Sequence, residues 1–358
     1  MRNLAHVEKI EWIKPIEGKD RIVLAGVLGW QVIVQKTEYN VGDMCVFCEI
    51  DSVFPEKPEF EFLRSKKFRI KTMKMGGVLS QGICFPMSIL PDNKKYKIGD
   101  DVTEVLGITQ YEATMDVEKD DSGKKKKRYP KWLMRWSWFR KLVSNGNKKQ
   151  EKGFPEFLSK TDETRIQNAP FYLNRDITWI ATEKVDGQSG SFVLEKKRRR
   201  FGNKFEFMVC SRNLRIWTPD NSSYWKVAKK YEIEKVLHKI IGDAPWVAIQ
   251  GECVAPAVQG NKYHVKEADL YVFNVVYPGK RLGSLEAKKL MEEHGLKFVP
   301  IINEQVKIKG MSVTELLDYA TGNSVLYDTL REGIVFRSPD GEQSFKAVSP
   351  EFLMKHGE

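Results

Sequence analysis

The stretch Glu183-Lys184-Val185-Asp186-Gly187 places a lysine between two acidic residues, with a glycine directly after them. A lysine acts as a covalent nucleophile only as the free amine, and an ordinary pKa near roughly 10.4 leaves almost none of it deprotonated at neutral pH. A bound cation or a second lysine nearby lowers that pKa, and acidic groups hold the cation. A glycine beside the nucleophile lets phosphate oxygens approach the backbone. Alone, Lys-x-Asp-Gly also fits a turn at a strand end. The downstream residues decide between a nucleophile and such a turn.

Five further segments follow this stretch in a fixed order. Together they resemble motifs Ia, III, IIIa, IV and V of the covalent nucleotidyltransferases, the superfamily of ATP-dependent DNA ligases, RNA ligases and messenger-RNA capping enzymes, with Lys184-Val185-Asp186-Gly187 as motif I. The segment that resembles motif III has the longer form that is typical of RNA ligases. In chain order, the segments are Ser211-Arg212-Asn213, Gly251-Glu252-Cys253-Val254-Ala255-Pro256-Ala257-Val258-Gln259-Gly260-Asn261-Lys262-Tyr263, Leu270-Tyr271-Val272-Phe273-Asn274-Val275, Glu332-Gly333-Ile334-Val335-Phe336-Arg337 and Ser344-Phe345-Lys346-Ala347-Val348-Ser349.

The residues upstream of the nucleophile narrow the resemblance. Residues 154–168 resemble the lead-in of the RNA ligase 5 family, whose members place an OB domain before the nucleotidyltransferase domain. DNA ligases and capping enzymes carry their OB domain after motif V, and only twelve residues follow Lys346 here. The chain is therefore identified as resembling an ATP-dependent RNA ligase. A GTP-dependent capping-type transferase and a non-catalytic RNA-binding protein are the alternatives.

The pattern of the chain predicts an α+β fold in two parts. Arg21–Gln35 and Asp43–Ile50 are short runs rich in β-branched residues, with glycines at the bends. Such strands predict a small barrel, and the OB fold recurs beside nucleic-acid enzymes. From residue 153 the pattern is mixed, with helices expected at Tyr224–Ile241 and Leu285–His294, the second capped by Ser284. We predict an OB-like β-barrel at 1–111, a basic, aromatic linker at 112–152, and a mixed α/β, ATP-grasp-like nucleotidyltransferase domain at 153–358.

The resemblance implies a role for each site residue. Lys184 would attack the α-phosphorus of ATP to give lysyl-AMP, the adenylate would pass to an RNA 5′-phosphate, and a 3′-hydroxyl would displace AMP. Asp186 and Glu332 would hold Mg²⁺ or Mn²⁺, whose preferred ligands are hard oxygens. For each acid the alternative is a salt bridge or a cap, and for Phe273 a place in the core. The remaining roles are Lys346 at the α-phosphate, Glu252 at the ribose hydroxyls, Phe273 on adenine, Arg212 and Arg165 at ribose or phosphates, Ser189 at a phosphate, and Glu183 in the nucleotide site.

Four positions depart from the pattern of the family. Val348 stands where many relatives have a second lysine of motif V. Either Lys346 does the phosphate work alone, or another base such as Arg337 contributes. The other departures are Ala255 and Ala257 in place of the usual glycines, and Asn274 in place of an aspartate. They bear on the fine geometry of the site rather than on the reaction.

The net charge of +11 is localised in one segment. Between Lys124 and Lys152 there are twelve Lys and Arg against the single acid Glu151, which accounts for the whole excess. This segment also places Trp132, Trp136, Phe139 and Val143 on one helical face. A short helix that docks its tryptophans while its bases stay solvated, a phosphate-binding segment with base stacking, and a helix on a membrane surface all fit this pattern. The RNA-binding candidates here are Lys124, Lys125, Lys126, Lys127 and Arg128.

A second basic surface is expected in the N-terminal part. If residues 67–74 form a strand, Lys67, Arg69 and Lys71 share one face, and Phe68 and Ile70 the other. Either the basic face is simply solvated, or it lines a groove for a phosphate backbone.

The cysteine content and the hydropathy of the chain indicate the cellular compartment in which the protein works. Five cysteines in no regular framework favour a reducing compartment, and Cys45-Val46-Phe47-Cys48 is interpreted as buried thiols rather than a metal or redox site. No apolar run reaches the roughly 20 residues of a membrane span. We expect a cytoplasmic enzyme that needs no membrane or obligate protein partner. Its substrate would be RNA with 5′-phosphate and 3′-hydroxyl ends in a nicked or splinted duplex.

Overall fold

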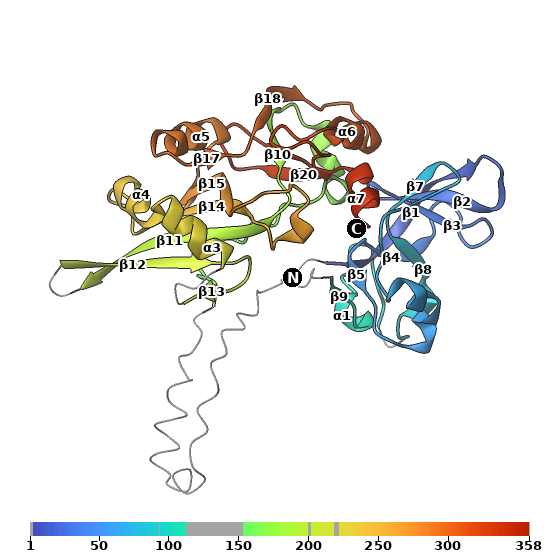
Figure 1. Cartoon of the computed structure of the whole chain (residues 1–358). Coiled ribbons are helices and arrows are strands. Elements are labelled where there is room, and N and C mark those ends of the chain that lie inside the picture. The colour runs from blue at the N-terminus through green and yellow to red at the C-terminus, as the bar shows by residue number, and fades with distance from the viewer. Residues whose placement is uncertain (1–2, 93, 112–152, 200–201, 218–221, 358) are drawn as a thin grey trace, which may run out of the picture.

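The computed structural model describes residues 3–92, 94–111, 153–199, 202–217 and 222–357. Figure 1 shows two parts side by side, with strands β1 to β9 in blue to cyan and strands β10 to β20 in green to red. The predicted linker at 112–152 lies outside the described residues, so the predicted domain boundaries stay a prediction. No helix within the described ranges is long and apolar enough to cross a membrane.

The N-terminal part is built on a sheet with the strand order β3-β2-β1-β4-β8. The long strand β1 pairs with β4 along its first half and with β2 along its second, and its register shifts between Ile10 and Trp12. Such a bulge bends a strand, which lets one strand serve two differently oriented neighbours. The strands are β1 (Ala5–Ile16), β2 (Lys19–Val27), β3 (Trp30–Gln35), β4 (Met44–Cys48) and β8 (Ile83–Pro86), with the pairs β5 (Ser52–Val53) and β9 (Thr109–Gln110), and β6 (Met73–Met75) and β7 (Val78–Ser80).

Short helices and a continuous apolar core complete this part. Trp30 and Phe47 are fully buried in the core. Cys45 and Cys48 are buried free thiols, as predicted, and the other three cysteines of the chain are buried free thiols as well. The short helices are η1 (Pro58–Lys66), η2 (Met87–Ile89) and α1 (Thr103–Leu106).

The C-terminal part contains two antiparallel sheets with helices packed on them. One sheet has the order β18-β10-β19-β20 and the other β13-β12-β11-β14-β15-β16, with β17 parallel to β15. The strands are β10 (Thr178–Lys184), β11 (Gln188–Arg199), β12 (Gly202–Cys210), β13 (Arg215–Ile216), β14 (Trp246–Val254), β15 (Asp269–Tyr277), β16 (Lys280–Arg281), β17 (Lys297–Phe298), β18 (Ile301–Lys307), β19 (Gly333–Arg337) and β20 (Ser344–Val348).

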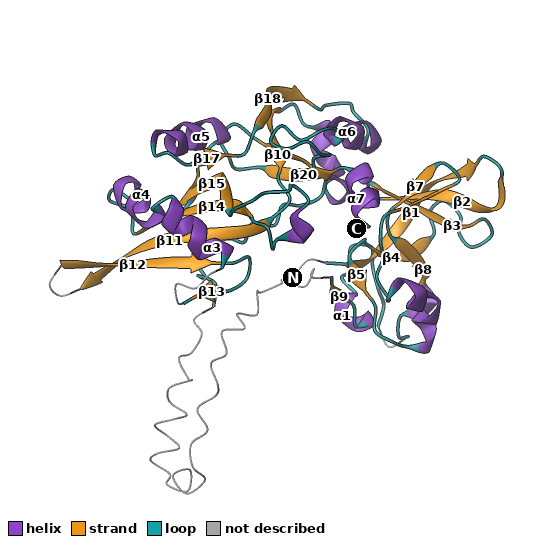
Figure 2. Ribbon diagram, in the orientation of Figure 1, coloured by secondary structure: helices purple, strands orange, loops and turns teal. Residues whose placement is uncertain are grey.

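Helices cover both sheets, as Figure 2 shows. Helices α3 and α4 contact β14, α5 contacts β15, and α6 contacts β19 and β20. The helices of this part are α3 (Ser223–Lys230), α4 (Ile233–Ile240), α5 (Ser284–Glu293), α6 (Val313–Ala320) and α7 (Pro350–His356), with the turns η4 (Ile166–Asn168), η5 (Pro170–Asn174) and η6 (Gln259–Asn261). The predicted α+β class is confirmed.

Three sequence-based predictions about elements are wrong in detail. The helix expected at Tyr224–Ile241 is two helices, because Glu232 takes a left-handed backbone with φ 46°. The expected cap Ser284 is the first helical residue, and Gly283 is the N-cap. The strand expected at 67–74 is absent: Lys67 and Phe68 have φ of 54° and 57°, and only Met73–Met75 forms a strand.

The two parts of the chain share a tight interface. Val348 and Leu353, at the C-terminal end, belong to the N-terminal apolar core. The Gly29 amide donates to the Gln167 carbonyl at 2.9 Å, and a Cβ on Gly29 would lie 2.7 Å from Cα of Gln167. Glycine at this position therefore lets the two backbones meet.

Candidate active site

Strand pairing brings the predicted nucleophile to the predicted metal ligand. Lys184 ends β10 and lies opposite Gly333 of β19, so Glu332, one residue before Gly333, reaches the lysine. The distance between Lys184 Nζ and Glu332 Oε2 is 2.5 Å. The Lys184 side chain is 23% exposed, which leaves it open to a ligand. Two motifs that lie 148 residues apart in the sequence thus meet in the structure.

Gly187 allows the nucleophile's loop to lie against β14. A Cβ on Gly187 would lie 2.5 Å from the Cys253 carbonyl oxygen, so this approach requires glycine. The adjacent strand pairing sets Ser189 opposite Glu252. The Ser189 hydroxyl donates to Glu252 Oε2 at 3.0 Å. In the absence of a ligand, Ser189 therefore orients the Glu252 carboxylate.

The electrostatics of the cluster are dominated by burial and by neighbouring acids. Burial lowers the pKa of Lys184, but the negative charges of Glu332, Glu252 and Asp186 outweigh it, and the pKa lies above its ordinary value. Burial raises the pKa of Glu252 to about 8, with Lys184 acting against the shift and Glu332 adding to it. Positive charge placed beside these acids would release the lysine as a free amine.

Asp186 is held by a lysine and a tyrosine of the motif III loop. Asp186 Oδ2 is 2.9 Å from Lys262 Nζ, and the backbone amide of Asp186 donates to the Tyr263 hydroxyl at 2.7 Å. Sequence reasoning assigned no role to either residue. Both stand inside the motif III stretch Gly251 to Tyr263, so that stretch was the available signal.

Lys346 lies on the same face of the sheet as Lys184. The register runs from Thr182 through Val335 to Lys346, and from Lys184 through Gly333 to Val348. Directly opposed residues project to the same face, and so do residues two apart on one strand. Both lysines therefore face the same side of the sheet.

The segment before η4 links this sheet to the N-terminal part. The Lys346 amide donates to the Thr164 carbonyl at 2.8 Å, and Arg165 forms a β-bridge with Lys346. The buried Arg165 side chain reaches Asp51 of the N-terminal part, with 3.4 Å between Nη2 and Oδ2. Arg165 is thus placed beside Lys346 and between the two parts.

Phe273 and Arg337 form a second group in this part. Phe273 lies in β15, half-buried, and the Arg337 guanidinium carbon is 5.8 Å from its ring centroid. Arg337 is buried and donates to Thr182 Oγ1 at 3.0 Å and to Glu163 Oε1 at 3.4 Å. Burial lowers the pKa of Arg337 to about 10. Arg337 is therefore committed to protein partners, as is Glu163, which the sequence did not single out.

The two other nucleotide-site candidates also contact protein groups. Arg212 forms an ion pair with Asp162, in the segment that follows residue 153. Glu183 is buried and accepts from the Ser324 hydroxyl at 2.5 Å and from the Val325 amide at 2.8 Å. Burial raises the pKa of Glu183 despite these hydrogen bonds.

The prediction of a basic strand face at residues 67–74 of the N-terminal part is wrong. Phe68, Arg69 and Ile70 are consecutive buried residues, so this segment does not alternate between a buried apolar face and an exposed basic face. Arg69 pairs with Asp51 at 2.8 Å, and its guanidinium carbon lies 3.5 Å from the Tyr111 ring centroid. Lys67 is exposed and Lys71 half-buried. The other RNA-binding candidates, Lys124 to Arg128, lie outside the described residues.

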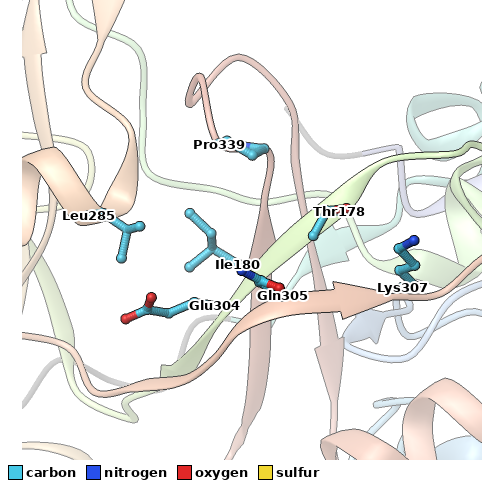
Figure 3. Close-up of a pocket in the computed structure, with 7 residues that line it drawn as sticks. All are labelled: Thr178, Ile180, Leu285, Glu304, Gln305, Lys307 and Pro339. Carbon is cyan, nitrogen blue, oxygen red and sulfur yellow. The ribbon is translucent and has the colours of Figure 1, made fainter.

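The charged cluster is distinct from the open hollow shown in Figure 3. That hollow has a volume of about 730 Å³ and lies beside β10 and β18. None of the candidate site residues lines it. Its lining residues are Thr178, Ile180, Leu285, Glu304, Gln305, Lys307 and Pro339.

The acids of the cluster suit a hydrated magnesium or manganese ion. Within the described part of the chain, no three His, Cys, Asp or Glu side chains form a ready-made metal cage. Mg²⁺ does not need one, because it keeps several waters and binds through one or two carboxylates together with substrate phosphates. Glu332 contacts Lys184, and Asp186 lies two residues after Lys184 in the sequence. This donor set fits such an ion.

Comparison with known proteins agrees with this arrangement. A family model for an OB-fold domain matches residues 4–87, and one for RNA ligases matches residues 177–348. An apo mutant of an RNA ligase from Naegleria gruberi is similar in structure, with a TM-score of 0.81, 28% identity, and coverage of 99% of this chain and 98% of that one. The same ligase with pyrophosphate has a TM-score of 0.80 at 28% identity, covering 100% and 99% of the two chains.

A further structure, a mutant of that ligase with ATP and manganese, has a TM-score of 0.80 and 28% identity, with 99% and 98% of the chains covered. No curated protein sequence matches the chain. The predicted order of an OB fold followed by a ligase domain is confirmed. Residues 177–348 therefore form a domain of the RNA ligase family, with an OB-fold domain ahead of it.

Proposed function

We propose that this protein is an ATP-dependent RNA ligase that joins 3′-hydroxyl and 5′-phosphate ends through a lysyl-AMP at Lys184. The observation that carries the proposal is the contact of 2.5 Å between Lys184 and Glu332 at the end of β10. Asp186 and Glu252 act electrostatically on the same amine, and Lys346 faces the same side of the sheet. A lysine among several acids suits a reaction in which cations and phosphates meet a nucleophile.

The first step would transfer AMP to the enzyme. Nζ of Lys184, as the free amine, attacks the α-phosphorus of ATP, so that an N–P bond forms, the bond to pyrophosphate breaks, and the amine loses a proton. Lys346 stabilises the negative charge that develops on the α-phosphate. A divalent cation, Mg²⁺ or Mn²⁺, held by Asp186 and Glu332, would neutralise phosphate charge and favour the amine form of the lysine.

The second and third steps would transfer AMP to RNA and seal it. An oxygen of the RNA 5′-phosphate attacks the lysyl-AMP phosphorus, the P–N bond breaks, and Lys184 recovers a proton. A 3′-hydroxyl then attacks the activated 5′-phosphate and loses its proton, and AMP leaves with the bonding electrons. Each step exchanges one phosphorus bond for another and requires no further co-reactant.

The remaining site residues would bind the nucleotide. Phe273 is a half-buried aromatic on β15 and would stack on adenine. Glu252 would accept from the ribose hydroxyls in place of Ser189. Arg212 would exchange its exposed partner Asp162 for a ribose or phosphate oxygen. Arg165, Ser189 and Glu183 complete the proposed nucleotide site.

The RNA would be a nicked or splinted duplex that contacts both parts of the chain. We assign an OB domain to residues 1–111, a linker to 112–152 and the nucleotidyltransferase domain to 153–358. The basic stretch Lys124 to Arg128 would bind backbone phosphates. Five buried free thiols support a reducing, cytoplasmic setting.

The similar structures support the nucleotide assignment. The Naegleria gruberi RNA ligase is represented in mutant forms with ATP and manganese and with AMP and manganese, and as a complex with pyrophosphate. ATP, AMP and pyrophosphate are the nucleotide substrate and the two leaving groups of the proposed reaction.

Mass spectrometry of the intact protein tests the proposal. Incubation with ATP and Mg²⁺ should add one AMP, and Lys184→Ala should abolish the adduct. Incubation with GTP should leave the mass unchanged. A GMP adduct, or an AMP adduct that persists in Lys184→Ala, would reject the assignment.

A further inference from the structure

The second base of motif V is replaced by an apolar contact. Val348 is in line with Lys184 across Gly333, but it is only 2% exposed and belongs to the N-terminal apolar core together with Leu353. The alternative, Arg337, is buried and bonded to Glu163 and Thr182. Neither position brings a second positive charge to the nucleotide site.

Lys262 brings such a charge from another direction. Its Nζ lies 2.9 Å from Asp186 Oδ2, and its side chain is 13% exposed. The Phe352 ring of α7 lies 4.8 Å from the same nitrogen. A largely buried ammonium group is therefore fixed beside Asp186, a proposed metal ligand that lies two residues after the nucleophile in sequence.

The loop that carries Lys262 is clamped onto the nucleophile's own loop. Gln259 Nε2 donates to the Gly187 carbonyl at 3.4 Å, and the Tyr263 hydroxyl accepts from the Asp186 amide at 2.7 Å. Gln259 and Asn261 have φ of 49° and 50°, a left-handed backbone that strains residues other than glycine. Strain held by contacts on both sides of Lys262 gives this lysine one defined position.

We propose that Lys262 is a nucleotide-binding residue whose ammonium group contacts a phosphate of ATP. This inference rests on the proposed function. In the chain alone Lys262 compensates Asp186 and Lys184 compensates Glu332, so two lysines take the two carboxylates that would hold a divalent cation. If Asp186 held a divalent cation, the Lys262 ammonium, which is largely buried, would require another anion. The nucleotide phosphates supply that anion, and Lys262 thereby provides the charge that Val348 does not.

Equilibrium binding separates this role from a structural one. Titration calorimetry with ATP and with adenosine, each with Mg²⁺, is measured in a Lys184→Ala background that cannot form the covalent adduct. Adding Lys262→Met should weaken ATP binding by about tenfold to hundredfold, the range for one hydrogen bond to a charged group. Adenosine binding should not change. Lys262→Arg should bind ATP within about threefold of the parent, because it keeps the charge.

A matched control is Lys266→Met, which removes an exposed lysine four residues along the same loop. If Lys262→Met does not fold, Lys262→Gln is read in its place, with thermal unfolding checked for every variant. Unchanged ATP binding, or an equal loss for ATP and adenosine, overturns the inference. Absence of ATP binding in the Lys184→Ala parent, together with no AMP adduct in the wild type, would instead reject the proposed function.

Discussion

Nε1 of Trp30 donates a hydrogen bond to Oδ1 of Asn168 at 2.5 Å, which joins the N-terminal sheet to the turn that precedes β10. The same Asn168 donates through Nδ2 to Glu49 Oε1 at 2.5 Å. Three residues earlier, Arg165 forms the β-bridge with Lys346. The N-terminal part therefore contacts the segment that lies against a proposed catalytic lysine.

Trp30→Phe should destabilise the folded protein. The phenyl ring keeps much of the packing in the core but leaves the Asn168 carbonyl oxygen without its indole donor. We expect a loss of about 2 kcal/mol in the free energy of unfolding, measured by urea denaturation. Trp12→Phe, at a half-exposed position on β1, is the control and should lose less. Equal losses in the two variants would contradict a specific role for the Trp30 contact.

Stability should fall with rising pH because of His6. Burial lowers its pKa, but hydrogen bonds to Glu49 and Glu8 outweigh burial and raise the pKa to about 9. The folded state therefore binds the proton more tightly than the unfolded state, whose His pKa is about 6.5. The stabilisation is complete below that value and is lost as pH rises through about 9.

The measurement is the free energy of unfolding of the wild type minus that of His6→Gln across pH 6 to 10. This difference should decrease by at most about 3 kcal/mol over the range. A difference that stays constant with pH would show that the pKa of His6 is the same in the folded and the unfolded protein.

Glu332→Ala and Lys346→Ala should each slow lysyl-AMP formation by about a hundredfold or more, because both remove charge that acts at the α-phosphate. The rate is followed with radiolabelled ATP, and circular dichroism checks the fold. Glu304→Ala and Lys307→Ala are matched controls on β18 of the same sheet, where both side chains are exposed. A variant that keeps the wild-type rate would remove its residue from the site.

Gly187→Ala should impair the same step without a charge change. The new Cβ would lie 2.5 Å from the Cys253 carbonyl oxygen, so the loop with Lys184 must shift. A displacement near 1 Å costs about a hundredfold in rate when it affects reacting groups. Gly153→Ala is the control, since a Cβ there meets nothing within 4 Å. Normal adenylylation by Gly187→Ala would show that the loop tolerates the shift.

The order of motifs in the sequence predicted which residues meet in the sheet. Lys184, Glu332 and Lys346 come together because strands β10, β19 and β20 are adjacent, and regular pairing preserves that information. Arg69 could not be predicted. Its burial depends on the left-handed backbone at Lys67 and Phe68 and on the distant Tyr111 ring. Both arise from tertiary packing, which residue alternation does not encode.

The pairing of Lys262 with Asp186 was hidden for a similar reason. Sequence reasoning assigned the motif III stretch to the nucleotide site, but the direction of each side chain depends on the irregular backbone at Gln259, Asn261 and His264. No periodic pattern describes such a loop. The absence of a lysine at Val348 was visible in the sequence, whereas its burial against the N-terminal core was not.

Neutralising Lys124 to Arg128 should weaken RNA binding and leave lysyl-AMP formation unchanged, because these bases are five of the twelve that make up the charge excess of residues 124–152 and lie far from Lys184 in sequence. Each lost phosphate contact should lower the slope of log affinity against log salt by roughly 0.7 to 0.9. Binding of a nicked duplex is measured by fluorescence anisotropy at several salt concentrations. Replacing the exposed Lys229, Lys235 and Lys239 of α3 and α4 is the control and should leave the slope unchanged. An unchanged slope after neutralising 124–128 would mean that this segment is a solvated tether and that the RNA contacts lie elsewhere in the chain.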